Sequence, residues 1–215
     1  MAHDLKSPIT RARGQLELLL NMERPDKHTI EAIIQEHDDI THCFNALLRI
    51  SQIERSQYKV SDRQFDFAEV IATVVEIFEP SAEEKRQNLS YKIDHGNLEI
   101  EGDKNQWLQA VSNLLDNAIK YTPEGGKIII RARSTTYRQR DVIELTVCDS
   151  GMGIPEHEQA SVLQRFYRLH EHATSKGHGL GLSLVQAVCQ HHQAKLSLSN
   201  HCGLVVTIFI PKKVS

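Results

Sequence analysis

The stretch NLLDNAIKYTP, residues 113–123, decides how the second half of this chain folds. Its apolar residues belong to a stripe formed by Leu108, Val111, Leu115, Ala118 and Ile119. Spacings of three and four residues predict a helix over 103–120 with one face in the core. The polar side chains that share the other face are Asn113, Asn117, Lys120 and Tyr121. Amides, a cation and an aromatic ring together suit a phosphorylated ligand with its metal, although a solvated helix face shows the same pattern.

A second stretch, DSGMGIP at residues 149–155, follows the apolar run VIELTVC. Asp149 therefore stands at the end of a strand, where its carboxylate faces the adjacent cleft. Gly151 and Gly153 permit a ligand to approach the backbone closely. A tight strand-to-helix turn with Pro155 at the first helical position is the alternative interpretation.

A third stretch, GHGLGLSLV at residues 177–185, is a glycine-rich turn that leads directly into a helix. Unbonded N–H groups at a helix start can hold phosphate. The stretch is not a Walker A loop, because the lysine-serine ending is missing.

The elements around these stretches predict an α+β fold. We expect helices over 68–79, 103–120, 155–165 and 180–192, and strands over 65–67, 89–93, 98–101, 127–134, 141–148, 195–200 and 204–210. Adjacent strand pairs indicate hairpins, and therefore an α/β sandwich whose mixed sheet is covered by helices on one face.

Residues 1 to 57 predict a helical hairpin. The second helix carries a stripe at Ile30, Ile33, His37, Ile40, Phe44, Leu47 and Ile50. Two helices cannot bury both of their stripes alone, so we expect a homodimer in which two hairpins form a four-helix bundle. His37 is expected to be partly buried there.

Bulk composition excludes several classes. The net charge of -3 does not favour nucleic acid, and Arg131, Arg133, Arg138 and Arg140 are expected on the solvated face of an edge hairpin. The four dispersed cysteines indicate a reducing compartment, and no apolar run reaches the roughly 20 residues of a membrane helix. We therefore expect a cytoplasmic location for this chain. The histidines expected on the surface, rather than on zinc, are His170, His172, His178, His191 and His192.

In order and spacing, HDLKSPIT (3–10), NLLDNAIKYT, DSGMGIP, RFYR (165–168) and GHGLGL resemble the H, N, G1, F and G2 boxes of sensor histidine kinases. The resemblance implies a dimerisation and phosphotransfer hairpin over 1–57, a linker over 58–64 and a Bergerat-type ATP-binding domain over 65–215. It also implies ATP and Mg²⁺ as cofactors and a response regulator receiver domain as partner. A full-length relative of this kind can be an inner-membrane sensor.

Site residues follow from the same resemblance. It implies that His3 accepts the phosphoryl group, that Asp4 activates it, and that Arg168 meets the terminal phosphate. Asn117 is the implied magnesium ligand. The implied nucleotide-binding residues are Asn113, Asn117, Lys120, Tyr121, Asp149, Gly151, Gly153, Gly177, Gly179, Leu180 and Gly181.

Two departures and two alternatives remain. Ser7 stands where kinases that also dephosphorylate their partner commonly carry threonine or asparagine, and Leu163 replaces an F-box phenylalanine. A non-catalytic nucleotide-binding docking module would show the same ATP motifs, and so would an ATPase or serine kinase on the same fold. Neither of the latter needs the HDLKSP hairpin.

Overall fold

The computed structural model describes Thr10, Leu19 and residues 13–14, 16–17, 27–55, 63–94, 96–169 and 179–213. Its elements are α2 (Lys27–Arg55), β1 (Gln64–Asp66), α3 (Phe67–Glu84), β2 (Asn88–Ile93), β3 (Glu99–Glu101), α4 (Lys104–Tyr121), β4 (Lys127–Tyr137), β5 (Arg140–Asp149), the 3-10 turns η1 (Glu156–Glu158) and η2 (Ser161–Leu163), α5 (Gly181–His191), β6 (Lys195–Asn200) and β7 (Leu204–Pro211). No helix among the described residues combines the length and the hydropathy that a membrane crossing requires.

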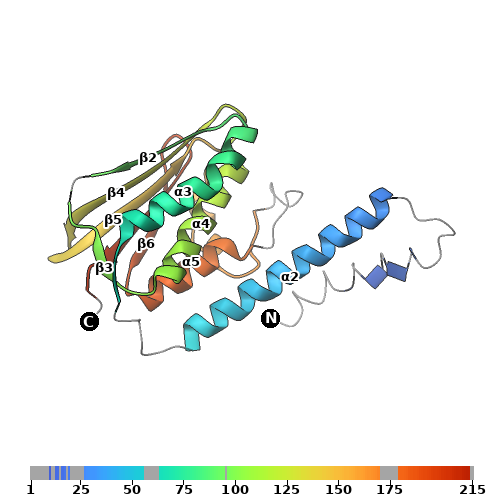
Figure 1. The fold of residues 1–215 in the computed structure, drawn as a ribbon, viewed down its shortest axis with the longest axis horizontal. Helices are drawn as coiled ribbons and strands as arrows, with labels where there is room; N and C mark the ends of the chain where they lie inside the picture. Colours follow the sequence, from blue (N-terminus) through green and yellow to red (C-terminus); the bar gives the residue numbers. More distant parts are fainter. Residues whose placement is uncertain are drawn as a thin grey trace.

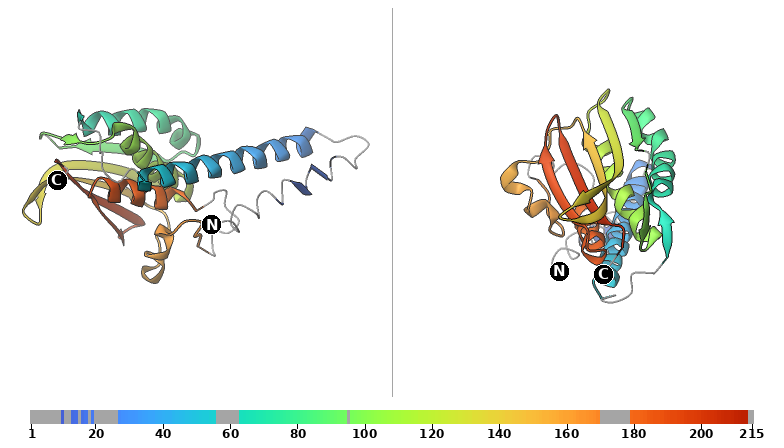
Figure 2. Two further views of the ribbon diagram at one scale, coloured as in Figure 1. Left: turned by 90° about the horizontal axis from the view of Figure 1, so that it is seen from below. Right: turned by 90° about the vertical axis from the view of Figure 1, so that its left-hand side faces the viewer.

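The main sheet has five strands in the order β2-β4-β5-β7-β6. β2 runs parallel to β4, while the pairs β4–β5, β5–β7 and β6–β7 are antiparallel. α3, α4 and α5 lie together on one face of this sheet (Figures 1 and 2). The predicted α+β class, the mixed sheet and both hairpins are therefore confirmed.

Three local predictions were wrong. α3 continues through Pro80 to Glu84, because Ala82 extends the buried face while Pro80 stays exposed. The expected helix over 155–165 is two separate 3-10 turns, of which only Val162 is buried. β4 and β5 are inner strands rather than an edge hairpin, although Arg133 is exposed as expected and pairs with Glu144 at 2.7 Å.

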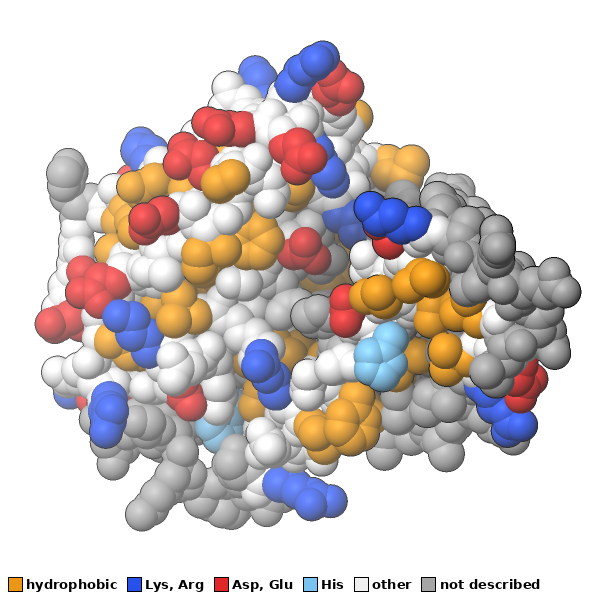
Figure 3. Space-filling model, turned by 45° about the vertical axis from the view of Figure 1, so that its right-hand side comes forward, with side chains coloured by type: hydrophobic (Ala, Val, Ile, Leu, Met, Phe, Trp, Pro, Cys, Tyr) orange, Lys and Arg blue, Asp and Glu red, His pale blue; other side chains and the backbone are white. Residues whose placement is uncertain are grey.

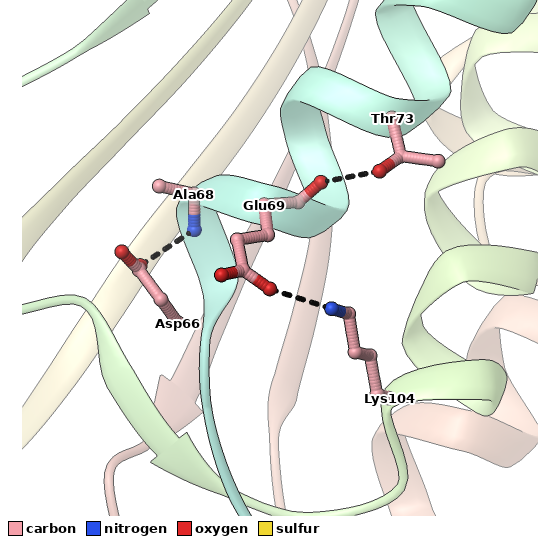
Figure 4. A network of polar contacts seen from close by, with 5 residues as sticks. All are labelled: Asp66, Ala68, Glu69, Thr73 and Lys104. Carbon is pink, nitrogen blue, oxygen red and sulfur yellow. Dashed lines mark hydrogen bonds and ion pairs between the residues drawn. The ribbon is translucent and has the colours of Figure 1, made fainter.

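Polar contacts tie the starts of α3 and α4 together (Figure 4). The Asp66 carboxylate accepts a hydrogen bond from the Ala68 N–H at 2.9 Å and so caps α3. In the same first turn, Glu69 pairs with Lys104 of α4 at 2.6 Å, and the Thr73 hydroxyl donates to the Glu69 carbonyl at 2.8 Å. These contacts therefore fix the start of α3 relative to the start of α4.

His192 is buried, so its expected surface position was wrong. It is 1% exposed, and its ring centroid lies 5.0 Å from that of Trp107 in the core. Its Nε2 accepts a hydrogen bond from the Asp103 N–H at 3.1 Å, and its Nδ1 lies 2.9 Å from the Val188 carbonyl, to which it donates. Burial lowers the pKa of His192 to about 4 from 6.5. The neutral ring thus connects the start of α4 to the end of α5.

This burial predicts a loss of stability in acid. Below pH 6.5 His192 becomes protonated in the unfolded chain, whereas in the folded chain it stays neutral down to about pH 4. The free energy of unfolding should therefore fall as pH falls. We expect this residue to remove about 2 kcal/mol by pH 5. Urea unfolding at pH 7.5 and pH 5 should show that contribution in the wild type and in His201→Gln, whose histidine is exposed. An equal fall in His192→Gln would contradict the assignment.

α2 presents two different apolar faces. Cys43, Ile50 and Ile53 are buried and join the core of the α/β layers. Other apolar side chains are exposed, namely Ile30, Ile34, Phe44 and Leu48. Hydrophobic side chains accordingly gather on the side of the molecule where α2 lies (Figure 3). His37 is exposed as well in the single chain. Its partial burial was expected in the bundle of two hairpins and stays a prediction.

Candidate nucleotide site

A cleft of about 880 Å³ lies beside α4 and the start of α5. Its walls come from α2, α4, the end of β5, the segment after η2 and the first turn of α5. The residues singled out from the sequence that line it are Asn113, Asn117, Lys120, Tyr121, Asp149, Gly153, Arg168, Gly179, Leu180 and Gly181. Segments far apart in the chain therefore meet at one cavity.

The polar face of α4 forms one wall. Asn113 donates through Nδ2 to the Gln109 carbonyl at 2.8 Å, so its Oδ1 remains an acceptor toward α5. A Cβ placed on Gly181 would lie 3.3 Å from Asn113 Oδ1 and 3.3 Å from Asn117 Nδ2. The two amides consequently border the first turn of α5, where the backbone N–H groups start a helix.

The end of α4 is fixed by side chains from outside the helix. Gln87 is buried, and its Nε2 donates to the Ile119 and Thr122 carbonyls at 3.0 and 2.6 Å. Lys85 donates to the same Ile119 carbonyl at 3.1 Å. These bonds satisfy carbonyls that a helix end leaves unpaired. They also hold Lys120, whose ammonium lies 5.1 Å from the ring centroid of its neighbour Tyr121.

Asp149 is a buried carboxylate, and one of its two oxygens accepts hydrogen bonds from the backbone. It is 7% exposed, and its Oδ1 accepts hydrogen bonds from the Gly151 N–H at 2.8 Å and the Leu204 N–H at 3.2 Å. Burial raises the pKa of Asp149, and these two backbone bonds lower it in part. Gly151 does not line the cleft itself but orients this carboxylate. Neither bond uses Oδ2, which stays available to a donor in the cleft.

A backbone hydrogen bond joins the segment before residue 170 to the segment after residue 178. The Phe166 N–H donates to the Gly179 carbonyl at 2.9 Å, and the Phe166 side chain packs on the core. The first turn of α5 then borders the cleft through Gly181 and Leu182. Among the described residues no side chain caps this helix start, so its N–H groups are suited to an anion.

α2 contributes a wall that the sequence did not predict. Cys43, Ala46 and Arg49 line the same cleft, and Glu54 of α2 forms an ion pair with Arg165. The nearest signal in the sequence was the apolar stripe of α2, but that stripe was assigned to the dimer bundle. His3, Asp4, Ser7 and Gly177 lie outside the described residues.

Comparisons with known proteins identify both halves of the chain. Residues 102–214 match the family model for histidine kinase-, DNA gyrase B- and HSP90-like ATPases, and residues 1–56 match the His Kinase A (phospho-acceptor) domain. The adaptive-response sensory kinase SasA of Synechocystis sp. is 28% identical over 91% of this chain and 53% of its own length. The sensor histidine kinase CusS of Escherichia coli O157:H7 is 26% identical over 99% of this chain and 44% of its own. The chain thus spans about half the length of these curated relatives.

Solved structures agree with this assignment. The histidine kinase ThkA, in its complex with the response regulator protein TrrA, has a TM-score of 0.76 and 26% identity over 98% of this chain and 59% of its own. The fold of the Acinetobacter baumannii histidine kinase AdeS has a TM-score of 0.73 at 23% identity, with 98% of each chain covered. With an ATPase-family model over more than half of its residues and the phospho-acceptor model over residues 1–56, the chain belongs to the sensor histidine kinases.

Proposed function

We propose that this protein is an ATP-dependent protein-histidine kinase that phosphorylates His3 and passes the phosphoryl group to an aspartate on a response regulator. One observation carries the proposal: a buried carboxylate and an uncapped helix start lie in a single cleft, in a chain whose first 56 residues match a phospho-acceptor domain. The carboxylate can bind the nucleobase of a nucleotide, and the helix start can bind its phosphates.

The base end of the site is Asp149. With Oδ1 held by two backbone N–H groups, Oδ2 can accept a hydrogen bond from the amino group of adenine. Ionised acceptors form stronger hydrogen bonds than neutral ones, especially away from water. A guanine base would present a carbonyl oxygen at that point and be repelled. This end therefore favours ATP over GTP.

The phosphate end lies between α4 and α5. The first turn of α5 offers N–H groups to phosphate oxygens, and we assign Lys120 and Arg168 to neutralise their charge. The amides of Asn113 and Asn117 border this turn and fit Mg²⁺, which prefers oxygen ligands and keeps several waters. When bound, Mg²⁺ would supply charge neutralisation at the phosphates. We assign Asn117 as its protein ligand.

The nucleophile is His3. A neutral imidazole has a free ring nitrogen that can attack the γ-phosphorus of ATP, so that an N–P bond forms and the bond from phosphorus to the β-γ bridging oxygen breaks, releasing ADP. Asp4 is proposed to accept a hydrogen bond from the other ring nitrogen and stabilise the positive charge that develops. In the second transfer the N–P bond breaks and an aspartate oxygen on the receiver takes the phosphoryl group.

The partners follow from the hairpin. We propose that residues 1–57 pair with a second copy, since Ile30, Ile34, Phe44 and Leu48 of α2 are exposed in the single chain. The linker 58–64 would let the ATP-binding domain 65–215 move to the histidine. ThkA was solved with a response regulator, which supports a receiver domain as the partner here. Because ATP is supplied in the cytoplasm, we propose that the catalytic part works there. Ser7 keeps a hydroxyl at the position of the phosphatase residue, and release of phosphate from a phosphorylated receiver domain would measure that activity.

Incubation of the full chain with γ-labelled ATP and Mg²⁺ tests the proposal. We expect label to remain on the denatured protein and then to move to an added receiver domain. Label that appears only as free phosphate would indicate an ATPase instead. Tight ATP binding with no label on protein or phosphate would indicate a docking module.

A further inference from the structure

Asn200, the last residue of β6, contacts the loop 149–154, which forms part of the wall of the cleft. Its Oδ1 accepts a hydrogen bond from the Ile154 N–H at 3.1 Å, and its Nδ2 donates to the Ile154 carbonyl at 2.7 Å. A primary amide has one acceptor and one donor side by side, so it can pair with both backbone groups of one residue. The Asn200 side chain therefore pairs with the Ile154 backbone as a neighbouring β-strand would. Asn200 as a whole residue is nevertheless exposed.

The same amide lies against Gly153. Gly153 has a φ of +72°, and a Cβ built on it would lie 2.6 Å from Asn200 Oδ1. Only glycine combines this backbone conformation with so close an approach. Since Gly153 and Ile154 both line the cleft, Asn200 sets the position of two residues of its wall.

The turn after Asn200 fastens the other end of the loop. Leu204 donates its N–H to Asp149 Oδ1 at 3.2 Å, and a Cβ on Gly203 would lie 2.3 Å from the Asp149 carbonyl oxygen. The turn 200–204 thus holds the loop 149–154 at both ends, at Asp149 and at Ile154. No backbone ladder joins the loop to the turn at Ile154, so the Asn200 amide supplies that attachment.

We propose that Asn200 is a positioning residue for the base end of the nucleotide site. The inference rests on the proposed function, because it assumes that Asp149 receives the base. By fixing Ile154 and Gly153, Asn200 sets the gap between the loop and the Asp149 carboxylate in which the base lies. It should therefore affect affinity for the adenine base and leave affinity for the phosphates unchanged.

Binding of ADP and of inorganic tripolyphosphate, each with Mg²⁺, separates these effects. For Asn200→Ala in the full chain we expect the dissociation constant of ADP to rise about tenfold, because the loop 149–154 is no longer held in position beside Asp149. The dissociation constant of tripolyphosphate should stay within about twofold, and the preference for ADP over GDP should narrow. Asn200→Asp should bind ADP as weakly as Asn200→Ala, because its second oxygen faces the Ile154 carbonyl. Ser199→Ala, an exposed neighbour on β6, is the control and should match the wild type.

Unchanged ADP affinity in Asn200→Ala would overturn the inference, and so would equal losses for ADP and tripolyphosphate, which would indicate general damage. Hydrogen exchange gives a second readout, since the Ile154 amide should exchange faster in Asn200→Ala, which lacks its acceptor, while the Leu204 amide keeps its rate. A wild-type chain that binds neither ADP nor ATP would contradict the proposed function itself, and this result is distinct from any difference between variants.

Discussion

Replacing His3 with glutamine should abolish covalent labelling from γ-labelled ATP. Glutamine keeps a polar side chain of similar length but has no basic ring nitrogen, so it cannot form the N–P bond. The nucleotide cleft is built from α2, α4, α5 and the end of β5, so the affinity for ATP should not change. The measurement is label retained on denatured protein, together with a binding isotherm for ATP.

The matched control for this variant is His157→Gln. His157 lies exposed on η1 and lines no part of the cleft, so its loss should leave labelling at the wild-type level. Full labelling of His3→Gln would show that another residue accepts the phosphoryl group. Loss of labelling accompanied by loss of ATP binding would indicate damage to the fold rather than to the chemistry.

Asp149→Asn should weaken ATP binding by about two orders of magnitude. Asparagine can keep the Oδ1 contacts to the Gly151 and Leu204 N–H groups, so the loop should retain its shape. Its amide nitrogen, however, replaces the free oxygen and presents a donor to the donor of adenine. A buried mismatch of this kind costs more than the loss of one bond, because both donors are left unpaired.

Asp141→Asn serves as the control for Asp149→Asn. Asp141 lies on the same strand, near the opposite end and exposed to solvent, so ATP affinity should be unchanged. Calorimetric titration of both variants with ATP and Mg²⁺ gives the comparison. Equal affinities of Asp149→Asn and the wild type would place the base elsewhere in the cleft.

Sequence periodicity predicted most of the fold because most elements bury one continuous face. α4 and β5 carry regular apolar patterns, and their ends place Asn117 and Asp149 at one cleft. The pattern failed where another force decided the structure. At Pro80 the burial of Ala82 outweighs the missing hydrogen bond, and α3 continues.

Contacts between distant residues were beyond the sequence pattern. His192 follows a helix end, and nothing in its neighbours shows that it lies against Trp107. Asn200 ends an ordinary strand, and its partner Ile154 is 46 residues away. Arg49 was part of a helix assigned to the bundle, yet it lines the nucleotide cleft. Each depends on packing that periodicity does not encode. The division into 1–57, 58–64 and 65–215, and the roles of His3, Asp4 and Ser7, stay predictions.

The chemical stability of the labelled bond tests the central claim most directly. A phosphoryl group on an imidazole nitrogen is lost in acid because protonation makes the ring a good leaving group, and it survives in alkali. The account predicts that label on the wild-type chain disappears in mild acid, persists in alkali and maps to the peptide that contains His3. Label that survives acid and is lost in alkali, as phosphoserine would be, would contradict it.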